Sequence, residues 1–95
     1  MKIEYSKHAK LKLRERGIGT SDIEKTVAIP DCVYYDLASR TMVAIRKVKI
    51  GGVETNLVVP FIKTENTVKI VTVYPCRGLE KELKKKEGAR WVRIK

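Results

Sequence analysis

The chain has 95 residues, and its 21 Lys and Arg against 11 Asp and Glu give a net charge of +10. This length suits one small domain, so we expect residues 1–95 to share a single core. No apolar run is long enough for a signal peptide or a membrane span, and we expect a cytoplasmic protein that does not contact a membrane. The excess of cations favours an anionic partner, first nucleic acid and then an acidic protein.

The sequence has few of the residues that bind metal ions in proteins. Cys32, Cys76 and the single histidine, His8, are too few for a structural zinc site, so we expect neither a metal nor a cofactor. In a reducing cytosol the cysteines would be small buried side chains. A composition rich in Lys, Glu, Val and Ile and without Gln resembles that of thermophile proteins, in which intracellular disulfides occur, so pairing stays open.

The first third of the chain predicts a helical hairpin. Ser6 is a suitable N-cap for a helix that ends at Gly17, with Tyr5 on the face toward the core. A second helix is predicted from residues 21–24, where Ser and Glu have capping-box spacing, up to Pro30.

After the helices, apolar residues alternate with polar ones, as is typical of β-strands. Two glycines, Gly51 and Gly52, separate two long runs and indicate a tight hairpin turn. Pro75 is expected to close the last strand. The predicted strands cover residues 32–36, 41–50, 53–62 and 68–74.

The tail holds Leu79 and Leu83 one helical turn apart, which predicts a helix over residues 78–86 that touches the body along a narrow stripe. Residues 90–95 alternate apolar and cationic side chains and could form an extra strand or a free arm. The predicted fold is α+β. Two N-terminal helices pack on an antiparallel sheet of about four strands, followed by a C-terminal helix and a short arm.

The positive charge is concentrated near the two ends of the chain. Residues 1–16 hold six cations and two anions, and residues 77–95 hold eight cations and three anions. We expect both segments to lie on one side of the molecule as a single nucleic-acid surface. Trp91 would stack on a base or, alternatively, pack on the body as part of an edge strand. The expected binding residues are Lys12, Arg16, Lys84, Lys85, Arg90, Trp91 and Arg93.

Four residues are candidates for chemistry. His8 lies on the first helix in line with two cations, and Arg46 stands among apolar positions of a predicted strand. Tyr74 and Arg77 flank the end of the last long strand, where a phenol and a guanidinium could meet a phosphate. Each also has a structural interpretation: a packed histidine, an arginine exposed by a bulge, a tyrosine closing the core edge and an arginine that caps a turn.

The order of residues in 6–18, followed by 21–24 and Pro30, resembles the opening of the family of domains of unknown function numbered 4258. Residues 68–75 resemble the last strand of that family. The family is distantly similar to the BrnT and RelE/ParE toxins, which are small basic proteins with helices on an antiparallel sheet. Those toxins are made together with an acidic or partly disordered antitoxin.

The resemblance implies a RelE-like toxin of a two-component toxin-antitoxin module, with RNA or the ribosome as target and an acidic antitoxin-like protein as partner. Along the RelE branch the reaction is metal-independent RNA cleavage, in which the 2′-hydroxyl attacks its own phosphate. We expect Arg46 and Arg77 to stabilise charge and His8 or Tyr74 to transfer protons. The ParE branch is not a nuclease, so the alternative is a non-catalytic module that binds nucleic acid or an acidic partner.

Overall fold

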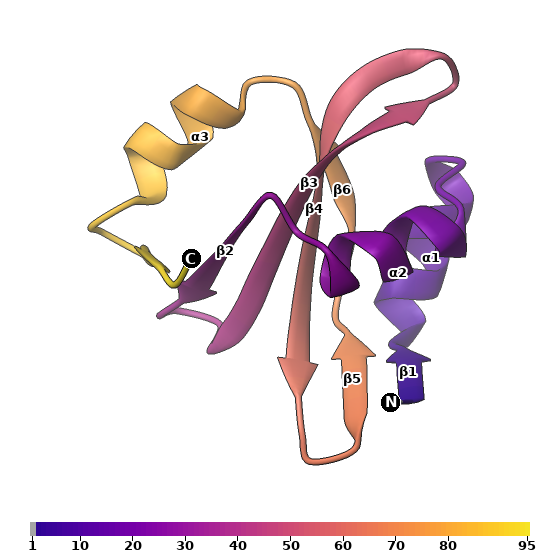
Figure 1. Cartoon of the computed structure of the whole chain (residues 1–95), viewed down its shortest axis with the longest axis horizontal. Helices are drawn as coiled ribbons and strands as arrows, with labels where there is room; N and C mark the ends of the chain where they lie inside the picture. Colours follow the sequence, from indigo (N-terminus) through magenta and orange to yellow (C-terminus); the bar gives the residue numbers. More distant parts are fainter. Residues whose placement is uncertain (1) are drawn as a thin grey trace.

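The computed structural model describes residues 2–95. It confirms the mixed α+β class, with three helices and a seven-stranded sheet in place of about four strands (Figure 1). The elements in chain order are β1 (Lys2–Tyr5), α1 (Lys7–Glu15), α2 (Thr20–Ala28), β2 (Cys32–Asp36), β3 (Thr41–Ile50), β4 (Val53–Lys63), β5 (Thr67–Ile70), β6 (Tyr74–Cys76), α3 (Leu79–Lys86) and β7 (Trp91–Arg93).

The strands are arranged in the order β1-β5-β4-β3-β2-β7, and β6 also pairs with β4. All pairs are antiparallel except β1 with β5, which is parallel. The long hairpin of β3 and β4 turns at Gly51 and Gly52, as predicted, and both glycines have positive φ. This hairpin forms the centre of the sheet.

The first helix begins as the sequence predicts. The backbone N–H of Ala9 donates to Ser6 Oγ at 3.0 Å, and Gly17 follows the helix with φ +62°. The sequence predicts Tyr5 on the face of this helix toward the core, but Tyr5 belongs to β1, because residues 2–5 pair with β5 before the helix starts. The predicted capping box at 21–24 is also wrong, since α2 already begins at Thr20 with Gly19 as its N-cap.

The predicted strand over residues 68–74 is divided into β5 and β6, which pair with different parts of β4. Between them the carbonyl of Val71 accepts from Ser6 Oγ at 2.7 Å, and that of Val73 accepts from Arg16 Nη1 at 3.3 Å. The two ends of α1 thus satisfy carbonyls in the break between the strands. Pro75, expected to close the strand, lies inside β6.

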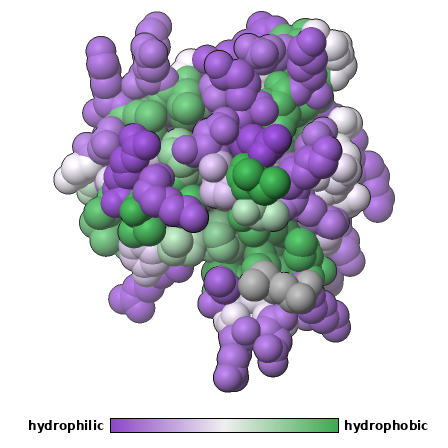
Figure 2. All heavy atoms as spheres, in the orientation of Figure 1, coloured by the Kyte–Doolittle hydropathy of each residue, from purple (hydrophilic) through white to green (hydrophobic). Residues whose placement is uncertain are grey.

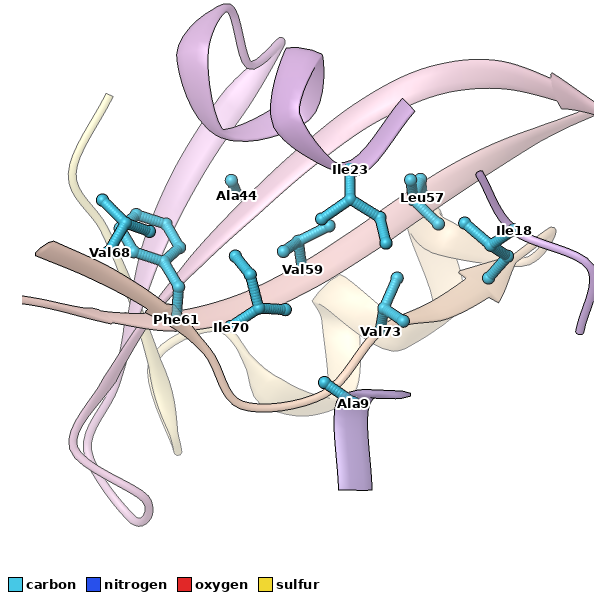
Figure 3. Packing of buried hydrophobic residues seen from close by; sticks show 10 residues of the cluster. All are labelled: Ala9, Ile18, Ile23, Ala44, Leu57, Val59, Phe61, Val68, Ile70 and Val73. Atoms are coloured by element: carbon cyan, nitrogen blue, oxygen red, sulfur yellow. The ribbon is translucent and has the colours of Figure 1, made fainter. Parts of the chain in front are cut away.

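Two apolar clusters cover the two faces of the sheet. The first lies between α1, α2 and the sheet, and Figure 3 shows Ile23 pointing from α2 toward β4. The second contains Tyr34, Val43 and Trp91, with Leu79 and Leu83 of α3 packed against it. Because neighbouring residues of a strand point to opposite faces, Val43 and Ala44 belong to different clusters. The members of the first cluster are Ala9, Ile18, Ile23, Ala44, Leu57, Val59, Phe61, Val68, Ile70 and Val73.

The arrangement of the helices corrects the expectation of one shared basic surface. Helix α1 packs on the first cluster and α3 on the second, so the two basic segments lie on opposite faces of the sheet. In Figure 1 they also lie at opposite sides of the view. A single nucleic-acid strand therefore does not meet both segments in one groove.

The C-terminal segment is a strand. Residues 91–93 pair with β2, and Trp91 is 2% exposed. Its indole is packed against Tyr34, with ring centroids 5.6 Å apart, and is therefore not free to stack on a base. The two cysteines, Cys32 and Cys76, are free thiols.

Thr55 on β4 offers a direct test of the packing. It is 7% exposed, and its Oγ1 has no hydrogen-bond partner among residues 2–95. Thr55→Val keeps the shape and removes a buried unsatisfied hydroxyl, so we expect the free energy of unfolding to rise by about 1 kcal/mol. Urea unfolding followed by circular dichroism measures this change.

Thr26→Val is the matched control, because Thr26 is fully buried but its Oγ1 donates to the Asp22 carbonyl at 2.7 Å. This variant should be no more stable than the unchanged chain. Equal effects of both substitutions would contradict the assignment of Thr55 as unsatisfied.

Candidate functional site

A small pocket of about 160 Å³ opens on the face of the sheet that α3 covers. It brings together Tyr74, Arg90 and Trp91, three of the residues that the sequence suggested, from β6 and from the segment after α3. Lys86 at the end of α3 adds a second cation. The remaining lining residues are Asp36, Ser39, Thr41, Pro60, Val71 and Thr72.

Asp36 is the buried centre of this pocket. It is 5% exposed, and its carboxylate accepts from the backbone N–H of Ala38 and Ser39 at 2.9 and 3.2 Å. It also accepts from Trp91 Nε1 at 3.1 Å and from Arg90 Nε at 2.9 and 3.0 Å. Burial by itself raises the pKa of Asp36, but these bonds to the charged form outweigh it and hold the pKa well below its usual value.

Arg90 donates to Asp36 from Nε alone, and 48% of its side chain is exposed. The two terminal nitrogens of its guanidinium donate no hydrogen bond to residues 2–95. Lys86 lies 4.6 Å above the Trp91 ring and forms an ion pair with Glu82 at 3.3 Å. Asp36 and Trp91 thus fix the positions of two cations at the mouth of the pocket.

Tyr74 supplies a proton donor in the pocket. Burial, with a further effect of the nearby Glu82 carboxylate, raises the pKa of Tyr74 to about 12. Its phenol therefore stays protonated at neutral pH and can donate a hydrogen bond or a proton. A proton donor beside two fixed cations is suited to binding a phosphate group.

The other three candidates for chemistry lie outside this pocket. His8 is exposed on α1, which covers the opposite face of the sheet. Arg46 donates from Nη1 to the Ile29 carbonyl at 2.8 Å, which ties β3 to the end of α2. Arg77 is exposed beside Thr55 near the turn of the β3–β4 hairpin. The structure does not bring these three residues together.

The remaining predicted binding residues are dispersed. Lys12 forms an ion pair with Glu15 at 3.5 Å on α1, and Arg16 holds the Val73 carbonyl as described above. Lys84 and Lys85 are exposed on α3. Arg93 lies with its guanidinium carbon 5.9 Å from the centre of the Tyr34 ring.

Sequence reasoning missed Asp36 and Lys86. Asp36 ends an apolar strand just before a polar turn, where a carboxylate often accepts backbone N–H groups, and that position was a usable signal. Lys86 and Arg90 are four residues apart, but Gly88 between them interrupts the helical spacing. The turn around Gly88 nevertheless keeps them together, because the backbone N–H of Arg90 donates to the Lys86 carbonyl at 2.7 Å.

Two properties of residues 2–95 bear on the classes of site. This part of the chain has no cluster of three His, Cys, Asp or Glu residues with the arrangement of a metal site. None of its helices combines the length and apolar character needed to cross a membrane.

Asp36→Asn tests the buried carboxylate. Since folding lowers the pKa of Asp36, its contribution to stability is present above the unfolded-state pKa of about 4 and is lost as pH falls below that value. We expect Asp36→Asn to lose about 2 kcal/mol at pH 7 and the difference from the unchanged chain to shrink toward pH 2. Urea unfolding across this pH range measures it, with Glu65→Gln in an exposed turn as control. A difference that does not change with pH would contradict the role of the carboxylate charge.

Comparison with known families gives one match, to the Domain of unknown function (DUF4258), over residues 5–75. The matched region contains Asp36 and Tyr74 but ends before Lys86, Arg90 and Trp91. Neither the comparison with curated proteins nor that with solved structures gave a significant match. The match covers well over half of the chain, and the protein therefore belongs to the DUF4258 family.

Proposed function

We propose that this protein is a toxin-like RNA-directed protein of a two-component module, and that its pocket beside α3 cleaves RNA without a metal. The observation that carries the proposal is the grouping of Tyr74, Lys86 and Arg90 around the buried Asp36. Its partner would be an acidic antitoxin-like protein, in keeping with the charge of +10.

In this mechanism the 2′-oxygen attacks the adjacent phosphorus and the bond to the 5′-oxygen breaks. The products are a 2′,3′-cyclic phosphate and a 5′-hydroxyl. Lys86 and Arg90 stabilise the negative charge that develops on the phosphoryl oxygens. Tyr74 donates its proton to the leaving 5′-oxygen, because its pKa of about 12 keeps it protonated.

The proton of the 2′-hydroxyl passes to water in this scheme. Asp36 is a poor base, since its hydrogen bonds hold its pKa low and occupy both carboxylate oxygens. The reaction rate should therefore rise with pH and should not fall through loss of the Tyr74 proton below about pH 10.

One observation favours a second candidate function. The pocket contains a proton donor and two cations but no free side chain that accepts a proton, because His8 lies on the opposite face. The same groups would equally bind a phosphate without turnover. In that case the protein is a non-catalytic nucleic-acid-binding module with salt-sensitive affinity.

A labelled single-stranded RNA incubated with the protein in chelator tests the proposal. Cleavage should leave a 2′,3′-cyclic phosphate and should be abolished by 2′-deoxy substitution at the cleaved position. We expect Tyr74→Phe to slow cleavage by about 100-fold or more while RNA affinity stays close to that of the unchanged chain. Product formation is followed by gel electrophoresis and affinity by fluorescence anisotropy.

Lys84→Ala and His8→Ala are the controls, since Lys84 is exposed on α3 outside the pocket and His8 lies on α1. Both should cleave within about twofold of the unchanged chain. Intact RNA at high protein excess, with and without ribosomes, would refute the catalytic proposal. If affinity then still falls steeply with salt, the binding module remains.

A further inference from the structure

A second surface lies on the face covered by α2, at the end of that helix. Two adjoining pockets of about 500 and 400 Å³ share Val27, Ala28, Phe61 and Lys63, and together they form what we call the α2 groove. Pro30, Val33, Tyr35 and Met42 extend the first pocket, and Ile3 and Val68 extend the second. The lining of both pockets is mainly apolar.

The groove is bordered by aliphatic side chains that remain in contact with water. Ile62 and Ile94 line the groove and are 43% and 53% exposed, and Ile29, between Ala28 and Pro30, is 64% exposed. Figure 2 shows green hydrophobic surface in the lower half of the view, bordered by purple polar groups. These exposed side chains would lose contact with water if another molecule bound in the groove.

Arg40 and Lys63 place cations at the groove. Both are exposed, and neither forms an ion pair with residues 2–95. Glu24, the one acidic lining residue of the two pockets, accepts from the Tyr5 hydroxyl at 3.1 Å. The edge of the groove therefore favours an anionic ligand.

The backbone of Arg40 adds an independent observation. Arg40 has φ +57°, and its N–H donates to the Asp36 carbonyl at 2.8 Å in the turn after β2. Glycine or asparagine would adopt this left-handed conformation at lower cost. This backbone conformation fixes the point at which the Arg40 side chain leaves the turn beside the groove.

We propose that the α2 groove binds an acidic segment of a partner protein that inserts two or three apolar side chains between these cations. The apolar lining provides the contact area and Arg40 and Lys63 select the carboxylates. A second copy of this chain fits poorly, because each copy carries +10. RNA fits less well, since its phosphates would contact only the cations and would leave the exposed Ile62 and Ile94 without an apolar partner.

This inference extends the proposed function by giving the acidic partner a binding surface. The groove lies on the α2 face, whereas the pocket with Tyr74 and Arg90 lies on the α3 face. The two surfaces meet at the turn after β2, because Arg40 lines the groove and its neighbours Ser39 and Thr41 line the RNA pocket.

Selection of the full chain against a displayed library of random peptides tests this assignment without RNA. Enriched peptides should combine Asp or Glu with Leu, Ile or Phe. Binding of a synthetic enriched peptide is then measured by fluorescence anisotropy. Ile94→Asp and Lys63→Glu should each lower the affinity for the peptide by about tenfold or more. Ile94→Asp places a carboxylate in the groove that repels the acidic peptide, and Lys63→Glu replaces a cation with an anion.

Arg40→Gly separates binding from folding. Glycine relieves the left-handed conformation, so the Tm of this variant should rise, while peptide affinity should fall by about threefold to tenfold. A merely structural role of Arg40 would not move the two quantities in opposite directions.

Leu11→Asp and Lys84→Glu are matched controls, because Leu11 is 52% exposed on α1, Lys84 is exposed on α3, and neither lines the groove. Peptide affinity should stay within about twofold in both. Enriched peptides without acidic residues, or full affinity in Lys63→Glu and Ile94→Asp, would overturn the proposal. Groove-dependent binding to vesicles of phosphatidylserine and phosphatidylcholine would also overturn it, in favour of a lipid surface. Loss of RNA cleavage does not affect this assay, so the two proposals fail separately.

Discussion

The hairpin of β3 and β4 is apolar on both faces, and the rest of the structure depends on this property. Ala44 and Leu57 point to one face, whereas Ile45 and Val58 point to the other, and all four are at most 1% exposed. A sheet of this kind is stable only if both faces are covered. The helices α1 and α2 cover the first face, and α3 with the Trp91 side chain covers the second.

The helices on the two faces differ in how much they bury. Helices α1 and α2 bury Ala9 and Ile23 completely, but α3 has no buried residue and contributes only the partly buried Leu79 and Leu83. Trp91 of β7 fills the remaining space, and its indole N–H needs an acceptor once it is buried. Asp36 provides that acceptor. The interaction that closes the second face thereby also holds Arg90 at the pocket, so stability and the candidate site share the same residues.

The sequence predicts the local structure well where a single element carries the signal. The cap at Ser6 and the turn at Gly51 and Gly52 are decided by nearby residues, and both predictions are confirmed. Residues 2–5 alternate polar and apolar side chains, but this four-residue pattern is short, and it becomes strand β1 by pairing with β5. The split of residues 68–74 also depends on distant partners, since Ser6 and Arg16 satisfy the carbonyls at the break. The sequence named Tyr74, Arg90 and Trp91 as candidates. That these three residues line one pocket depends on the pairing of β7 with β2.

The charge of the chain has a different meaning once the contacts of its cations are known. Arg16 and Arg46 looked like ligands for phosphate, but each donates to a backbone carbonyl that would otherwise lack a partner. A guanidinium can fill that role at the edge of a small core, because it satisfies a carbonyl with one nitrogen and keeps the others in water. Part of the +10 is therefore used to hold the fold together. Other cations lie at two separate surfaces: Lys86 and Arg90 line the pocket that holds Asp36 and Tyr74, and Arg40 and Lys63 line the α2 groove. The pocket adds the hydrogen-bonding groups of Asp36 and Tyr74 to its cations, whereas the groove adds the exposed side chains of Ile62 and Ile94. This difference is the physical reason to assign the two surfaces to two different partners.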